Sequence, residues 1–153
     1  DLHERAGSKT VAHLHGCVRY ARSWNDISQL VPYDRDIAIG DRAPDGSQLR
    51  PHVVLFEEML PEPDVERAQQ AINTADVMII VGTSLEVWPA SGLVDLLPQT
   101  SDLHLVDPSD LSRHFSRSLE HLQKPASIGV PELVSSLIER TFPLSGRDRG
   151  ISR

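Results

Sequence analysis

The stretch DVMIIVGTS, residues 76–84, constrains the fold more than any other part of the chain. Its apolar run from Val77 to Val81 leaves no polar face for solvent. A strand of this kind is typical of the centre of a parallel sheet, because helices cover both faces of such a sheet. The run is far too short to cross a bilayer as a helix. We therefore expect an α/β protein with a buried central strand.

The segments on either side of this strand alternate in type. Apolar runs bounded by turn residues predict strands, and apolar spacings of three and four residues predict helices. Their alternation favours a Rossmann-like parallel sheet with helices on both faces. We predict strands over residues 10–16, 53–56, 76–84 and 102–109, and helices over residues 65–75 (with Asp64 as the N-cap), 89–99 and 131–142.

Residues 17–50 are the least regular part of the chain, and several prolines and glycines mark turns in them. We expect this segment to be a small insertion of loops. The Rossmann-like domain would then consist of residues 1–16 and 51–144, with its N-terminal part absent from these residues. Residues 145–153 would form a tail.

Composition excludes some classes of function and disfavours others. A net charge of −7 gives the chain no general electrostatic reason to bind nucleic acid. Cys17 is the only cysteine, so an internal disulfide framework and a zinc site built from several cysteines are both excluded. The first residues carry no signal-peptide pattern. We expect a cytoplasmic protein without nucleic-acid or membrane partners.

Two predicted strands end in residues that suit a ligand. Gly82, Thr83 and Ser84 combine a position without a side chain and two hydroxyl groups. Asp107 follows the next strand and could accept hydrogen bonds from ribose hydroxyls. Ligands of open α/β sheets bind beyond the carboxyl ends of the strands, so these residues indicate a nucleotide site. The alternative is an ordinary turn from strand to loop.

His15, which precedes Gly16, is the candidate general base. Imidazole titrates near neutral pH, and the glycine would leave the ring accessible. The alternative is a structural histidine at a strand end. His13, two residues earlier, is interpreted as structural.

Several separated motifs resemble the sirtuin family, the NAD-dependent protein-lysine deacylases. The resemblance covers roughly residues 1–140, and the motifs that carry it follow one another in the family's order and spacing. The motifs are DLHERAGSK, HLHG, LRPHVVLFEE, ADVMIIVGTSLEVWPAS, LHLVDPS and KPASIGVPELV.

The resemblance implies roles for individual residues. His15 would act as the general base on a ribose hydroxyl of NAD, so that the acyl group passes from lysine to ADP-ribose and nicotinamide is released. Asp107 stands where the family usually has an asparagine beside the adenine ribose. The residues implied in NAD binding are Gly82, Thr83, Ser84, Asp107 and Ala126.

The resemblance also implies that an acyl-lysine peptide or protein binds as an added strand between two segments. Val53 and Phe56 would flank the acyl-lysine. Glu57 occupies a glycine position of the family, and a positive φ there would strain the backbone. The residues implied in substrate binding are Val53, Phe56, Glu58, Leu85, Glu86 and Val87.

Four positions of this chain correspond to the zinc-binding cysteines of sirtuins, namely Ser23, Asp26, Arg42 and Asp45. These side chains cannot make a thiolate site, and arginine is not a practical ligand. We therefore expect NAD as cofactor and no zinc. Arg42 could pair with Asp26 or Asp45 in place of the metal, or all four could be solvated loop residues.

Two functions stay open from the sequence. The glycine-rich NAD loop and the Gln-Asn-x-Asp motif with which sirtuins begin are not among these residues. The chain is either the C-terminal part of an NAD-dependent deacylase, or a catalytically incompetent fragment or pseudoenzyme that serves as a nucleotide-binding or interaction module.

Overall fold

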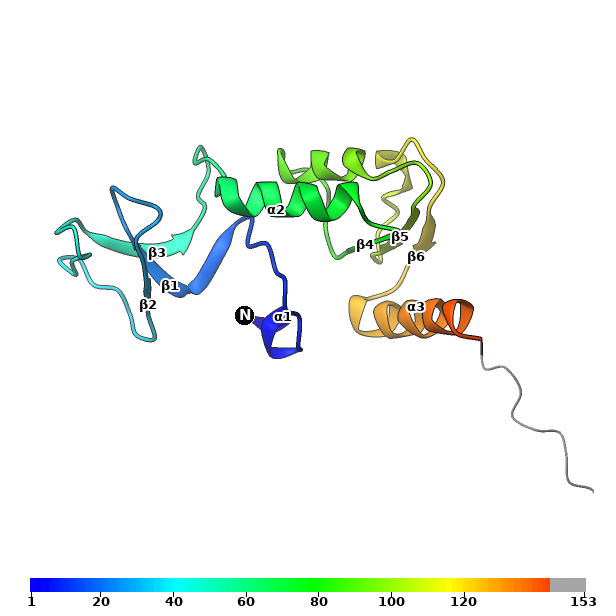
Figure 1. Ribbon diagram of the computed structural model, residues 1–153, viewed down its shortest axis with the longest axis horizontal. Coiled ribbons are helices and arrows are strands. Elements are labelled where there is room, and N and C mark those ends of the chain that lie inside the picture. The colour runs from blue at the N-terminus through cyan, green and yellow to red at the C-terminus, as the bar shows by residue number, and fades with distance from the viewer. Residues whose placement is uncertain (144–153) are drawn as a thin grey trace, which may run out of the picture. The chain divides into compact units, whose positions relative to one another are not determined.

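The computed structural model describes residues 1–143 and has two compact units (Figure 1). The first unit runs from Asp1 to Ala71, and the second begins at Ile72. The predicted tail, residues 145–153, lies outside the described residues.

The first unit is built on an antiparallel sheet with the strand order β2-β1-β3. The central strand pairs with both neighbours, and its register with β3 shifts between Gly16 and Ala21. Ala21 is fully buried and packs with Ala43 and Leu49 in a small core. The elements are α1 (Leu2–Arg5), β1 (Gly16–Ser23), β2 (Leu30–Pro32), β3 (Leu49–Val53) and α2 (Glu62–Asn73), which continues past Ala71.

The structure corrects four predictions for this unit. The strand expected over residues 10–16 is not formed. β1 begins at Gly16, so the glycine that was expected to end a strand starts one. β3 ends at Val53 because the chain turns immediately afterwards, which removes the strand expected over residues 53–56. The segment 17–50 holds the antiparallel sheet and is not only loops. α2 begins at Glu62, so Asp64 lies in its first turn and is not its N-cap.

The second unit contains the predicted parallel sheet, with the strand order β4-β5-β6. One face carries η1 and an apolar core of Ile80, Leu97, Leu103, Leu105 and Leu111, and the other face carries α3 (Figure 1). The α/β, Rossmann-like class is therefore confirmed. The elements are β4 (Val77–Val81), η1 (Ala90–Leu96), β5 (Asp102–Val106), η2 (Ser112–His114), β6 (Glu120–Leu122) and α3 (Ala126–Thr141).

The boundaries in this unit differ from the predicted ones. The segment expected as a helix over residues 89–99 is the 3₁₀ helix η1, and β5 ends at Val106 instead of residue 109. α3 begins at Ala126 and not at residue 131, so Pro131 lies inside the helix instead of at its start. The three-residue elements β6 and η2 have too short an apolar pattern to be recognised.

Candidate functional site

His15 lies in the turn that leads into β1, and its side chain is exposed. Its carbonyl oxygen accepts a hydrogen bond of 3.0 Å from the backbone N–H of Val54. Gly16 has a φ of 83°, and a Cβ there would overlap the carbonyl oxygen of His52 and lie 2.9 Å from Cα of Val53. The glycine therefore permits the close approach of β1 and β3, which presents the imidazole on a fixed backbone.

The irregular segment before β1 is held by α2 and α1. The Asp64 carboxylate accepts hydrogen bonds from the backbone N–H of His13 at 3.2 Å and from Arg67 at 2.8 Å. Arg67 also donates to the carbonyl oxygen of Val11 at 3.1 Å. A ring nitrogen of His13 lies 2.6 Å from the Glu4 carboxylate. These contacts give His13 the structural position expected for it, and they fix the backbone just before the candidate base.

The loop after β3 carries the residues implied in substrate binding. Val53 is half-buried at the end of β3, and Phe56 is 96% exposed. Glu57 has a φ of 72°, in the left-handed region that favours glycine. The strain expected for a glutamate at this position is therefore present. The turn presents the Phe56 ring to solvent beside a strained residue.

Replacing Glu57 with glycine should stabilise the protein. A residue with a Cβ is disfavoured in the left-handed region, and glycine removes that penalty at some cost in unfolded-state entropy, for a net gain of about 0.5–1 kcal/mol. Urea unfolding measures the gain. Glu57→Ala keeps the Cβ and is the matched control, so an equal gain from both substitutions would show that backbone strain is not the cause.

Glu58 closes the same loop through two buried arginines that sequence reasoning missed. Arg22 on β1 and Arg50 on β3 are cross-strand partners, 7% and 9% exposed. Both guanidinium groups donate to the Glu58 carboxylate, Arg22 at 3.0 Å and Arg50 through two nitrogens. The backbone N–H of Leu55 donates to the same carboxylate at 3.0 Å. Glu58 therefore anchors the loop, which differs from the direct substrate contact implied for it.

The same contacts set the acid sensitivity of the loop. The hydrogen bonds from Arg50 and from the Leu55 backbone lower the pKa of Glu58 from 4.5 to about 2. Because the folded-state pKa is depressed, the stabilisation is complete above pH 4.5 and is lost as the pH falls from there towards about 2.

We expect Glu58→Gln to lower the free energy of unfolding at neutral pH, and the difference from the parent to shrink between pH 4.5 and about 2. Urea titrations at several pH values measure it. Glu57→Gln, which removes an exposed neighbouring charge, should leave the pH profile of the parent unchanged. A difference between Glu58→Gln and the parent that does not vary with pH would contradict the assignment.

In the second unit, the predicted cofactor residues gather at the carboxyl ends of the parallel strands. Gly82 follows β4, and its backbone N–H donates to the carbonyl oxygen of Val106 at 3.1 Å. Gly82 has a φ of 59° and no atom within 4 Å of a Cβ position, so the space beside it is open. The hydroxyl of Thr83 accepts a hydrogen bond from Leu85, and Ser84 is exposed.

Asp107 and Ala126 follow β5 and β6 at the same edge. Asp107 is only 9% exposed, and its carboxylate accepts a hydrogen bond of 2.8 Å from the backbone N–H of Ser109. Its backbone carbonyl lies 3.1 Å from a ring nitrogen of His121. Ala126 is exposed as the first residue of α3. The fold therefore brings these positions together, although one Asp107 oxygen is already engaged in the turn.

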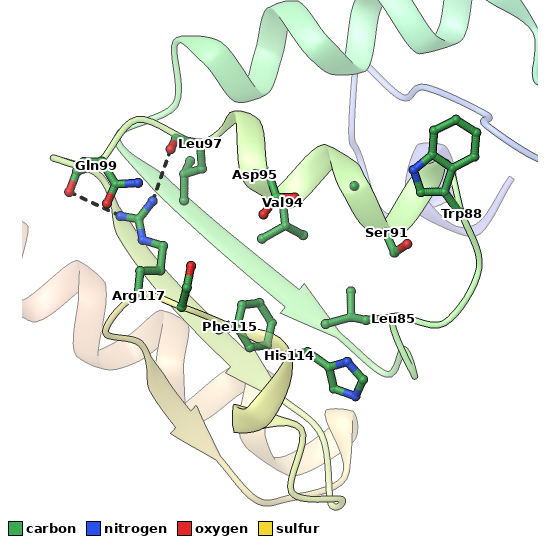
Figure 2. Close-up of a pocket in the computed structure, with 12 residues that line it drawn as sticks. Leu85, Trp88, Ser91, Val94, Asp95, Leu97, Gln99, His114, Phe115 and Arg117 are labelled. Carbon is green, nitrogen blue, oxygen red and sulfur yellow. Dashed lines mark hydrogen bonds between the residues drawn. The ribbon is translucent and has the colours of Figure 1, made fainter.

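The segment after Ser84 lies beside a cavity of about 310 Å³ (Figure 2). Leu85 has a φ of 56° and lines the cavity, whereas Glu86 and Val87 are exposed. Figure 2 shows Val94 and Asp95 of η1 on one side of the cavity and Phe115 on the other. Arg117 joins the two sides, because it donates to the carbonyl oxygens of Leu97, Pro98, Gln99 and Ser101.

The candidate residues thus form two sets, one in each unit. His15, Val53, Phe56 and Glu58 belong to the first unit. Gly82, Thr83, Ser84, Leu85, Glu86, Val87, Asp107 and Ala126 belong to the second. Sequence reasoning missed the roles of Arg22, Arg50 and Arg67 and gave Asp64 only the role of an N-cap. No local spacing links Arg22 and Arg50 to Glu58, or Asp64 and Arg67 to the segment before β1.

Residues 1–143 contain neither a cluster of metal ligands nor a membrane-spanning helix. No three or more His, Cys, Asp or Glu side chains are arranged to hold a metal ion there. No helix in this part of the chain is long and apolar enough to cross a membrane.

Comparison with known proteins identifies relatives of the chain. The NAD-dependent protein deacylase of Bacteroides thetaiotaomicron is 43% identical over 144 residues, which cover 90% of this chain and 61% of the relative. That of Helicobacter pylori strain 26695 is 35% identical over 139 residues, 91% of this chain and 60% of the relative. The chain therefore spans about 60% of the length of these relatives.

Solved structures agree with this relationship. A Sir2 homologue in complex with NAD matches with a TM-score of 0.78 and 33% identity, covering 92% of this chain and 56% of that one. A Sir2 complex with a p53 peptide and NAD⁺ matches with a TM-score of 0.68 and 27% identity, covering 92% of this chain and 59% of that one. The Sir2 family model matches residues 1–89, more than half of the 153 residues. The chain belongs to the Sir2 family.

Proposed function

We propose that this chain carries the general base and part of the NAD and substrate sites of an NAD-dependent protein-lysine deacylase. Its substrate would be an acyl-lysine peptide or protein. The observation that carries the proposal is the exposed imidazole of His15 on a backbone fixed by Gly16 and Val54, in a chain of the Sir2 family. The deacylase names and the NAD complex among the relatives support the activity and the cofactor.

The residues present fit NAD at the carboxyl edge of the parallel sheet. Gly82 leaves open space for a ligand to approach the backbone, and Ser84 offers an exposed hydroxyl. When bound, NAD supplies the ribose that accepts the acyl group and the nicotinamide that leaves. His15 would take up the proton of a ribose hydroxyl, which suits an imidazole at neutral pH. The exposed Phe56 would contact the acyl-lysine. The Leu85–Val87 segment would offer backbone groups to a peptide bound as an added strand.

The test is nicotinamide release from NAD in the presence of an acetyl-lysine peptide. We expect the chain to release nicotinamide once the rest of the NAD site is supplied, and His15→Ala to fall to background under the same conditions. His3→Ala, which removes another exposed imidazole, is the matched control and should keep the parent rate. Release by His15→Ala at the parent rate would remove His15 from the mechanism. NAD binding by calorimetry without any release would favour the alternative function, a nucleotide-binding module.

We further propose that the protein needs no zinc. Ser23, Asp26, Arg42 and Asp45 correspond to the zinc-binding cysteines of sirtuins, and a network of hydrogen bonds joins the two segments that carry them. Ser23 is 1% exposed, and its hydroxyl donates to Asp45 at 2.6 Å. The same oxygen accepts the backbone N–H of Asp26 at 3.0 Å and lies 2.9 Å from the Ser47 hydroxyl. The hydrogen bond from the Ser23 hydroxyl lowers the pKa of Asp45 most, and the backbone N–H and hydroxyl of Ser47, which donate to the same carboxylate at 2.9 and 2.8 Å, lower it further.

Arg42 takes no part in this network. Within the described residues it donates to the carbonyl oxygen of Gly46 at 3.2 Å, and it forms no ion pair with Asp26 or Asp45, the first of the two alternatives left open above. A guanidinium and a buried hydroxyl do not fit a zinc site. Metal analysis of the purified protein should find no stoichiometric zinc, and unfolding with and without a chelator should coincide. One zinc per chain would contradict the proposal.

We also propose a reducing, cytoplasmic setting, supported by the free and buried thiol of Cys17. The net charge of −7 supports the absence of a nucleic-acid partner. Cell fractionation tests the location, and a gel-shift assay with duplex DNA or RNA at low salt tests the partner. Recovery of the protein in a membrane fraction, or a shift at low salt, would contradict these statements.

A further inference from the structure

The loop after β3 contains a tight turn over residues 55–58, and Phe56 and Glu57 form its tip. The backbone N–H of Glu58 donates to the carbonyl oxygen of Leu55 at 3.1 Å, and Glu57 has the positive φ of the third position in a type II turn. The backbone N–H of Leu55 in turn donates to the Glu58 carboxylate, which the two buried arginines hold. The tip of the turn is therefore fixed in place after β3.

Glu57 departs from the residue preference of its place in this turn. The third position of a type II turn is normally glycine, because a residue with a Cβ is strained at positive φ. Within the described part of the chain, no basic side chain forms an ion pair with the Glu57 carboxylate, and the residue is exposed. Strained residues that gain no structural contact are concentrated at functional sites. The glutamate therefore indicates a role towards a ligand.

The acidic side chains near Glu57 differ from it, because each has a structural role. Glu58 is paired with the two buried arginines, and Asp64 holds the segment before β1. Glu62 lies in the first turn of α2, where the helix dipole favours a negative charge. The other neighbours of Glu57 in the loop are apolar and exposed, namely Leu55, Phe56 and Met59. Glu57 therefore carries an unpaired charge on an exposed apolar surface.

We propose that Glu57 selects acyl-lysine peptides that carry a basic side chain close to the acyl-lysine. The inference rests on the proposed function and deepens it, because it names the class of peptide. Phe56, which would contact the acyl-lysine, directly precedes Glu57, and the Cα atoms of consecutive residues are only about 3.8 Å apart. A peptide held on Phe56 therefore brings its next residues within reach of the carboxylate. A basic side chain there would pair with Glu57, and an acidic one would be repelled.

The net charge of −7 is the alternative source of such a preference. A general negative potential attracts every basic peptide, wherever its basic residue lies. A local pair with Glu57 instead favours a basic residue at a particular distance from the acyl-lysine. The two causes therefore differ in how binding depends on the position of the basic residue, and in whether removal of another exposed carboxylate has the same effect.

The test measures the binding of labelled acetyl-lysine peptides by fluorescence anisotropy, with the rest of the NAD site supplied as for nicotinamide release. Each peptide carries arginine, glutamine or glutamate at one of the two positions on either side of the acetyl-lysine. At one of these positions we expect arginine to bind about two- to fivefold more tightly than glutamine, and glutamate more weakly. Glu57→Gln should abolish the difference, and Glu57→Lys should reverse it. Glu62→Gln, which removes another exposed carboxylate of the same unit, is the matched control and should keep it.

Each outcome decides the proposal. Reversal by Glu57→Lys would establish the local pair, because loss of folding cannot reverse a preference. Equal binding of the arginine and glutamine peptides would overturn the inference and leave the proposed deacylase function intact. A preference that Glu57→Gln and Glu62→Gln reduce equally would assign it to the net charge, and one that Glu57→Gln leaves unchanged would assign it to another residue, so both would overturn the inference. Failure of every peptide to bind would overturn the proposed substrate, and the inference with it.

Discussion

Gly16→Ala should be the most damaging single substitution considered for this protein. The new Cβ would overlap the carbonyl oxygen of His52 and lie 2.9 Å from Cα of Val53, and both are backbone atoms of β3 that cannot rotate away. The φ of 83° adds left-handed strain. Together these effects should lower the free energy of unfolding by about 2–5 kcal/mol, measured by urea unfolding.

Gly46→Ala separates the two contributions. Gly46 has nearly the same φ, 81°, but no atom lies within 4 Å of its Cβ position. Its substitution should therefore cost only the left-handed strain, about 1–2 kcal/mol. Equal losses at Gly16 and Gly46 would show that the approach of β3 is not what requires the glycine.

The contact between Gly16 and β3 shows how far the His-Gly pair can be understood from sequence. From the sequence, Gly16 is expected to leave His15 accessible and to end a strand. In the structure the glycine begins β1 and makes room for the backbone of β3. A residue on another strand, remote in the sequence, imposes that requirement, so no local pattern could reveal it.

The parallel sheet was predictable because its signal is local. The apolar run of β4 and the helix and strand patterns that follow it carry their periodicity within a few residues. The antiparallel sheet of the first unit was not predicted, since β1 carries three consecutive exposed residues in place of an alternating pattern. The register shift between Gly16 and Ala21 explains that break in alternation.

Part of the candidate site could likewise be predicted from the sequence, and part could not. The positions after β4, β5 and β6 follow from topology, because the carboxyl ends of parallel strands share one edge of the sheet. The anchoring of Glu58 by Arg22 and Arg50 does not follow, since it depends on the register of β1 with β3. The network around Ser23 likewise depends on two loops meeting, which composition and spacing do not indicate.

Gly129→Ala should be the second most damaging substitution. A Cβ at Gly129 would lie 2.5 Å from a methyl group of Val106, which is fully buried on β5. Alanine favours the helix by about 0.5–1 kcal/mol, but overpacking of a buried contact costs about 1–3 kcal/mol. The clash dominates when Val106 cannot move, so we expect a net loss of about 1–2 kcal/mol in urea unfolding.

A double-mutant cycle with Val106→Ala identifies the cause. Val106→Ala alone should destabilise the protein by leaving a cavity, and Gly129→Ala should then place a methyl group in that space. The double variant should therefore be more stable than the sum of the single losses, with a coupling of about 0.5–3 kcal/mol. Strict additivity would place the strain elsewhere in α3. Coupling would show that Gly129 sets the approach of α3 to β5, and hence the place of Ala126 at the carboxyl edge of the sheet where the cofactor is proposed to bind.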